Sequence, residues 1–105
     1  MVMRRTDVWW ADLPPPAGRR PVVLVSRQKA IEVRSAVTAA QVTTKVRGIP
    51  TEVPLGAAEG LPKDCVVNVD VLFTVEKTRL VERAGALSAE KRGALDEALR
   101  FALGL

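Results

Sequence analysis

The stretch that decides the fold is "AGRRPVVLVS", residues 17–26, in which two arginines directly precede an apolar run. The run is rich in β-branched valine and does not alternate polar with apolar residues. That pattern is typical of a strand covered on both faces or lying inside a small barrel. A strand entrance needs no charge, so Arg19 and Arg20 are either solvated loop residues or parts of a site.

The segments around this run carry further strand patterns. Upstream, "TDVWWADL" (6–13) alternates, so that Val8 and Trp10 share one face while Trp9 lies on the other. We therefore expect one tryptophan in the core and the other on an outer face. The stretch "PPPAG" (14–18) is predicted to be a loop, because proline lacks the N–H that a sheet ladder needs. Further strands are predicted at 36–46, 51–55, 65–75 and 81–87, a loop or short strand start at 30–35, and one helical turn at 76–80.

The hydrophobic period changes after residue 87. Ser88 is a predicted N-cap and Gly104 a predicted helix end. Between them an apolar stripe at helical spacing comprises Leu95, Ala98, Leu99, Ala102 and Leu103. Five or more short strands closed by one helix predict a mainly β chain of the α+β class, a small antiparallel barrel forming a single domain over residues 1–105.

Composition excludes several classes of protein. The chain has 105 residues, 48% of them hydrophobic, which supports one domain with a core. Its apolar runs are far shorter than the ~20 residues that a membrane span requires. No apolar region follows the N-terminal arginines, so we expect no signal peptide and a cytoplasmic location. Cys65 is the only cysteine and is expected to be a small core side chain. Without histidine or a second thiol, a zinc site and a Ser-His-Asp triad are both excluded.

Charge is distributed unevenly along the chain. Residues 1–50 carry nine Lys and Arg against three acidic residues, a net charge of +6, and residues 51–105 carry seven against nine, a net charge of −2. A basic half on a small domain indicates a polyanionic partner, with nucleic acid first. The alternative is ordinary solvated charge.

The groups that remain for chemistry are arginine, lysine, threonine and a few carboxylates. RNA cleavage suits them, because the ribose 2′-OH is an internal nucleophile beside the phosphate it attacks. A guanidinium can donate two parallel N–H bonds to phosphoryl oxygens, and a hydroxyl can add a third. Arginine is a poor general base, so its expected role is electrostatic.

Three segments together resemble the MazF/PemK toxins of bacterial type II toxin–antitoxin systems. They are "RRTDVWWADLPPPAGRRPVVLVSR" (4–27), "VTAAQVTTKVRGIPTEVPL" (37–55) and "DCVVNVDVLFTVEKTRL" (64–80). The resemblance implies an SH3-like antiparallel barrel of the CcdB/PemK kind that forms a homodimer. It also implies a metal-independent, cofactor-free endoribonuclease (mRNA interferase) that cuts single-stranded RNA at short sequences. The expected substrate is messenger RNA, with transfer and ribosomal RNA as alternatives, and the expected inhibitor is a cognate MazE-like antitoxin.

The resemblance also assigns residues. The family's catalytic arginine falls on Arg20 and its catalytic threonine on Thr43. Arg19 is expected to bind phosphate. Further candidates for the RNA path, each with plain surface charge or a turn as its alternative, are Arg27, Lys45, Arg47, Ile49, Pro50 and Thr51.

The chain departs from the family pattern at three places. A longer, Gly-rich first loop is replaced by "PPPAG", Val71 follows Asp70 where several members carry a polar residue, and Thr6 stands where an opening glycine is common. Two other functions stay open at this point. A CcdB-like toxin on the same fold would poison DNA gyrase, and a non-catalytic barrel would bind RNA without cutting it.

Overall fold

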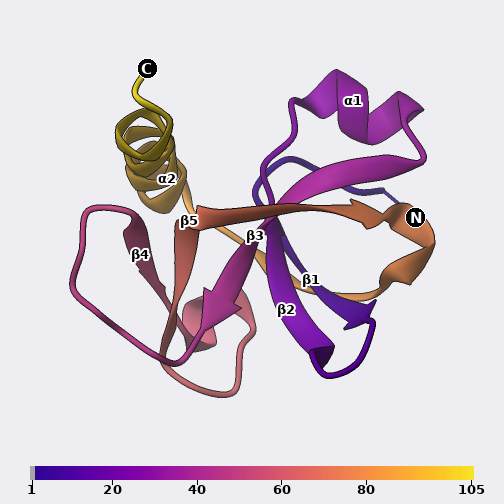
Figure 1. Cartoon of the computed structure of the whole chain (residues 1–105), viewed down its shortest axis with the longest axis horizontal. Coiled ribbons are helices and arrows are strands. Elements are labelled where there is room, and N and C mark those ends of the chain that lie inside the picture. The colour runs from indigo at the N-terminus through magenta and orange to yellow at the C-terminus, as the bar shows by residue number, and fades with distance from the viewer. Residues whose placement is uncertain (1) are drawn as a thin grey trace.

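The computed structural model describes residues 2–105 as one curled antiparallel sheet flanked by helices (Figure 1). Within these residues the order across the sheet is β4-β5-β3-β2-β1-β6, so the sheet is an open half-barrel rather than a closed ring. No helix in residues 2–105 is long and apolar enough to cross a membrane. The strands are β1 (Asp7–Leu13), β2 (Gly18–Leu24), β3 (Ala36–Thr43), β4 (Glu52–Leu55), β5 (Cys65–Glu76) and β6 (Leu80–Ala86); the helices are α1 (Gln28–Val33) and α2 (Ala89–Leu103), with 3₁₀ turns η1 (Ala57–Glu59) and η2 (Lys77–Arg79).

The predicted strands and the helical turn at η2 are confirmed, except that the strand predicted over 36–46 ends at Thr43. The prediction for residues 30–35 is wrong. A short α-helix, α1, occupies most of that segment. Its first turn closes when the Ala30 and Ile31 N–H groups donate to the Arg27 carbonyl, at 3.0 and 3.2 Å. Six residues are too few to display a helical period, and burial of the Ile31 side chain in the core favours the helix.

Both faces of the sheet are covered, each by its own core. One core lies beneath α2 and includes Val8, Val23 and Leu95; the other includes Trp9, Leu24 and Ile31. The expectation of an outer tryptophan is therefore wrong. Trp9 is 1% exposed in the second core, whereas Trp10 is half-buried and packs against the first. The run after Arg20 is covered on both faces, as the lack of alternation predicted.

Strand β5 bends sharply near its middle. The β3–β5 register jumps between Ala40, which faces Leu72, and Gln41, which faces Asn68. The Thr51 hydroxyl donates to the Asn68 side-chain oxygen at 2.9 Å, and the Val69 N–H donates to the Thr51 carbonyl at 2.9 Å. These buried bonds hold the bend, which lets one long strand serve both cores.

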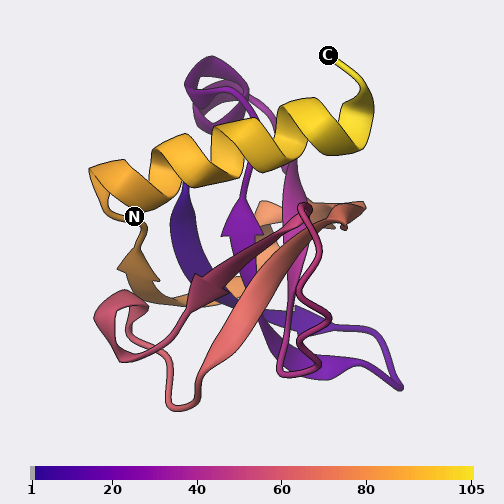
Figure 2. The ribbon, with the colours of Figure 1, turned by 90° about the vertical axis from the view of Figure 1, so that its left-hand side faces the viewer.

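The terminal helix α2 lies across the sheet (Figure 2). Its predicted ends are confirmed. The Ser88 hydroxyl accepts the Lys91 N–H at 3.2 Å, and Gly104 adopts a left-handed φ of 70°. Leu95 and Ala98 are buried, but Leu103, predicted to lie on the same apolar stripe, is 54% exposed at the last residue of the helix.

Candidate active site

Arg20 and Thr43 lie on neighbouring strands at the same end of the sheet. In the β2–β3 pair, Val22 faces Gln41, and continuing that register by two residues sets Arg20 opposite Thr43. Side chains directly opposite one another share a face of the sheet. Both residues line one cavity of about 230 Å³. The two residues that the family resemblance names are therefore neighbours in space.

The walls of this cavity are mainly apolar. Lys63 and Thr44 add polar groups to those of Arg20 and Thr43, and the remaining lining residues are Trp10, Pro21, Val42, Leu61, Pro62 and Cys65. A second hollow of about 270 Å³ also includes Arg20 in its lining, together with Gln41 and Phe73. Arg20 therefore lines both hollows.

The Arg20 guanidinium is exposed but oriented. Its Nε donates to the Ala17 carbonyl at 3.0 Å, which ties it to the proline-rich β1–β2 loop. The N–H groups on the two Nη nitrogens remain available for an anion. The Thr43 Oγ1 accepts the Lys45 N–H at 3.1 Å, so its own hydroxyl proton can still be donated. Arg20 and Thr43 therefore both keep unused donors at the cavity that they line.

Arg19 points away from Arg20, since successive residues of a strand face opposite sides. Its Nη2 pairs with the Glu82 carboxylate at 2.8 Å, and its guanidinium carbon lies 5.8 Å from the centroid of the Trp10 ring. Both contacts are solvent-accessible, so each is worth little energy. The structure nevertheless gives Arg19 an orientation of its own, along the β1–β6 side of the sheet.

The other RNA-path candidates divide by position. Lys45, Arg47, Ile49 and Pro50 are exposed on the β3–β4 loop, which starts directly after Thr43. The Arg47 N–H donates to the Glu52 carboxylate at 3.0 Å, which shapes that loop.

Two candidates lie apart from this loop surface. Thr51 is 3% exposed and its hydroxyl bonds to Asn68, so its side chain is turned inward. Arg27 precedes α1, beyond the opposite end of β2 from Arg20, so the fold does not bring it to the cavity.

Sequence reasoning assigned no role to Lys63, which lines the cavity together with Trp10. Lys63 comes from the η1–β5 loop, and only the tertiary fold brings that loop to Arg20. Cys65 is buried, as predicted. Burial first, then the nearby carboxylates of Glu59 and Asp64, raise the pKa of its thiol. It therefore stays protonated near neutral pH and is no nucleophile. Among residues 2–105, no group of three or more His, Cys, Asp or Glu side chains is arranged to hold a metal ion.

Comparison with known proteins defines the class. A family model described as PemK-like, MazF-like toxin of type II toxin-antitoxin system matches residues 4–103. The chain therefore belongs to the PemK/MazF toxin family.

Individual relatives agree over the full length of the chain. Endoribonuclease MazF6 of Mycobacterium tuberculosis is 37% identical over 114 aligned positions that cover all of both chains. The solved structure of the Mycobacterium tuberculosis toxin MazF-mt6 superposes with a TM-score of 0.86 at 35% identity, covering 94% of this chain and 97% of that one. An endoribonuclease in complex with its cognate antitoxin, from a mycobacterial species, superposes with a TM-score of 0.87 at 31% identity, covering 99% and 97%.

Proposed function

We propose that this toxin is an endoribonuclease that cleaves single-stranded RNA at a short sequence without a metal ion. Its relatives are named endoribonucleases, which supports the activity. The observation that carries the mechanism is the juxtaposition of Arg20 and Thr43 at one cavity. The product ends would be a 2′,3′-cyclic phosphate, or the 3′-phosphate formed by its hydrolysis, and a 5′-OH.

In the proposed reaction, the ribose 2′ oxygen bonds to the adjacent phosphorus and the bond to the 5′ oxygen breaks. The proton lost by the 2′-OH is balanced by the proton that the departing 5′ oxygen gains. Negative charge builds on the non-bridging phosphoryl oxygens in between. The Nη groups of Arg20 and the hydroxyl of Thr43 would donate to those oxygens, and each such donor can be worth ~3 kcal/mol in the transition state. Arg20 is already oriented by Ala17, so little rearrangement is required.

The RNA strand would approach along the exposed β3–β4 loop. Lys45 and Arg47, which are exposed on this loop, would meet phosphates, and Ile49 and Pro50 would offer apolar contacts to bases. The inward side chain of Thr51 makes it a support for this loop, through Asn68, rather than a direct contact. Arg19 would bind a phosphate on the neighbouring side, once released from Glu82. Arg27 would touch only an RNA long enough to reach the α1 end of the sheet.

We also propose that the toxin acts in the cytoplasm as a homodimer and is inhibited by a cognate MazE-like antitoxin. A relative solved with its cognate antitoxin supports that partner. The exposed apolar side chains of Val71 and Val81 support a further protein contact on the sheet.

The decisive experiment incubates the protein with a long RNA in EDTA. We expect cutting at defined sites and products that carry 2′,3′-cyclic phosphate or 3′-phosphate ends. Arg20→Ala should lower the rate about 10²- to 10³-fold or more. A substrate with 2′-deoxyribose at the cut site should not be cleaved, because it lacks the nucleophile.

Three outcomes would overturn the proposal. Undiminished cutting of the deoxy substrate would exclude attack by the 2′-OH. RNA binding that weakens with salt but yields no products would indicate a non-catalytic barrel. Inhibition of DNA supercoiling without RNA cleavage would indicate a gyrase poison.

A further inference from the structure

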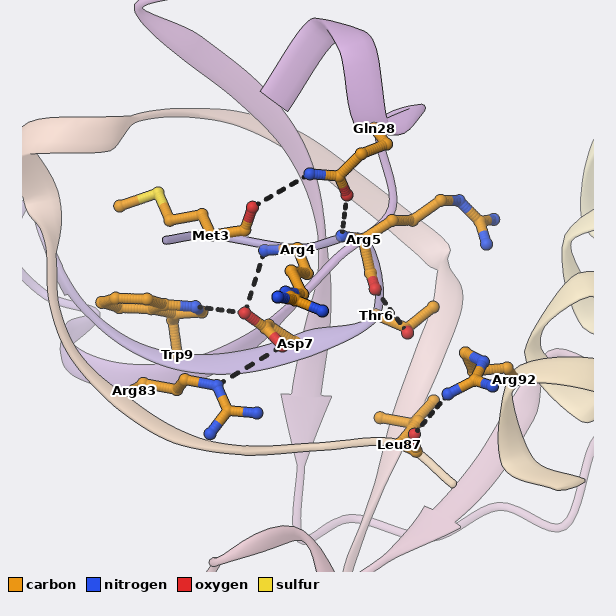
Figure 3. A network of polar contacts seen from close by, with 10 residues as sticks. All are labelled: Met3, Arg4, Arg5, Thr6, Asp7, Trp9, Gln28, Arg83, Leu87 and Arg92. Carbon is orange, nitrogen blue, oxygen red and sulfur yellow. Dashed lines mark hydrogen bonds and ion pairs between the residues drawn. The ribbon is translucent and has the colours of Figure 1, made fainter. Parts of the chain in front are cut away.

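A third cavity lies at the opposite end of β1 from the pairing partner of Arg20. It is open to solvent and is lined by residues of the N-terminal segment, α1, the end of β6 and the first turn of α2, several of which are drawn in Figure 3. Its volume is about 640 Å³, larger than either hollow beside Arg20 and within the range of ~300–1,000 Å³ typical of small-molecule sites. None of the residues named for RNA cleavage lines it.

The cavity is strongly basic. Four arginines line it, against the two carboxylates of Asp7 and Glu32. They are Arg4, Arg5, Arg83 and Arg92, drawn from three separate parts of the chain. Even when Asp96, which pairs with Arg5 at 3.0 Å, is counted as well, the positive charge exceeds the negative. Four like charges around one hollow repel one another, which an anionic ligand would relieve.

The buried carboxylate of Asp7 organises the floor of the cavity (Figure 3). Asp7 is 2% exposed, and its Oδ2 accepts the Arg4 N–H at 3.0 Å and the Trp9 indole N–H at 3.2 Å. Its Oδ1 pairs with the Nε of Arg83 at 3.4 Å. Both carboxylate oxygens are therefore engaged from within the protein. Arg83 is held by Nε alone, which leaves the N–H groups of both its Nη nitrogens for a ligand.

The other arginines differ in how far they are engaged. Arg5 donates from Nε to the Val25 carbonyl at 3.2 Å and from Nη2 to Asp96, so it mainly ties the N-terminal segment to α2. Arg92 uses one nitrogen, donating to the Leu87 carbonyl at 3.3 Å. Within residues 2–105 the Arg4 guanidinium has no hydrogen-bond or ion-pair partner. Arg4, Arg83 and Arg92 thus keep unused donors at one cavity.

We propose that this cavity binds a small ligand carrying two or more phosphate groups, held by Arg4, Arg83 and Arg92. Arginine binds phosphate through paired N–H donors, and three such groups at one cavity match an oligophosphate chain better than a single anion. Among residues 2–105 no aromatic side chain lines the cavity, and Trp9, which bonds to Asp7, is 1% exposed and offers no stacking face. The arginines would therefore recognise the phosphate groups of the ligand, which a free oligophosphate and a nucleoside triphosphate have in common.

The test titrates the full-length protein with inorganic tripolyphosphate and, separately, with ATP, by calorimetry at two salt concentrations. Arg4→Gln/Arg92→Gln removes two donors that hold no carboxylate, and the variant's fold is checked by circular dichroism. Arg34→Gln/Arg100→Gln is the matched control, because it removes the same charge from exposed positions outside the cavity. We expect saturable binding that the first variant weakens about tenfold or more and the control by less than about threefold.

A second measurement needs no variant at the cavity. Tripolyphosphate should shift the backbone amide resonances of Arg4, Arg83 and Arg92, in the wild-type chain and equally in Arg20→Ala. Equal affinity for tripolyphosphate and ATP identifies free oligophosphate as sufficient, whereas tighter ATP binding that the cavity variant abolishes identifies a nucleotide. The proposal is overturned by non-saturable binding, by unchanged affinity in Arg4→Gln/Arg92→Gln, or by loss of binding in Arg20→Ala. It is also overturned if only an uncleavable oligonucleotide binds there.

Discussion

The ion pair between Glu59 and Lys91 offers a sharp test of how α2 is fixed to the η1 turn. Glu59 is 2% exposed; its Oε1 accepts the Gly56 N–H at 2.7 Å and its Oε2 meets the Lys91 Nζ at 2.9 Å. Lys91→Met keeps the length of the side chain but removes the ammonium group. The carboxylate then remains buried with a single backbone donor, which is costly.

The size of the effect follows from the burial of each partner. Removing one partner of a buried pair costs ~3–5 kcal/mol. The Lys91 side chain is 31% exposed, so water can reach the vacated position, and we expect the lower end, about 3 kcal/mol. For a domain of this size, 1 kcal/mol corresponds to roughly 4–8 °C in Tm, so Lys91→Met should lower Tm by more than about 10 °C.

The assay is urea unfolding at pH 7, followed by the fluorescence of Trp9 and Trp10. Lys29→Met is the control, because Lys29 is exposed on α1, and it should change stability by less than about 0.5 kcal/mol. Glu59→Gln/Lys91→Met should be more stable than Lys91→Met alone, because a neutral amide can still accept the Gly56 N–H. A Lys91→Met protein as stable as the control, or a double variant no better than the single one, would refute the reasoning.

Three further results are expected. The ¹³Cβ resonance of Cys65 should titrate above the ordinary thiol pKa of about 8.5, because burial and nearby carboxylates raise its pKa; a midpoint at or below 8.5 contradicts this. Thr6 has a left-handed φ of 70°, which strains an L side chain, so Thr6→Gly should be more stable to urea than Thr6→Ala by about 1 kcal/mol. Equal stability of the two variants would show that the strain is absent. Thr43→Val should slow RNA cleavage by about tenfold or more, while Thr44→Val, the neighbour at the same cavity, should change the rate little; equal losses would remove the special role of Thr43.

Local sequence signals predicted the parts of the fold that depend on local chemistry. The β-branched run after Arg20 forms a strand covered on both faces. Ser88 and Gly104 cap the two ends of α2, as the capping rules predict. Alternation along β1 correctly separated Trp9 from Trp10, but it could not reveal that both faces are covered. Which face meets solvent is decided by distant segments.

In the candidate site, too, local motifs predicted some features, whereas others depend on contacts between distant segments. Family motifs named Arg20 and Thr43, and the fold sets them at one cavity, although their catalytic roles stay predictions. The partner of Arg19, the inward turn of Thr51 and the arrival of Lys63 at the cavity all depend on contacts far apart in sequence. Such contacts cannot be predicted from the sequence pattern of any one segment.

The hydrogen bond from Arg20 to the Ala17 carbonyl couples the orientation of the guanidinium to the conformation of one short, proline-rich loop. Proline restricts the conformations of that loop even in the unfolded chain, so the entropy of aiming the guanidinium is lost during folding rather than at each encounter with substrate. The same loop, through Ala17, borders the hollow that Gln41 and Phe73 also line. Replacing the three prolines of this loop by glycines would therefore loosen the orientation of Arg20 and reshape the adjoining hollow at the same time.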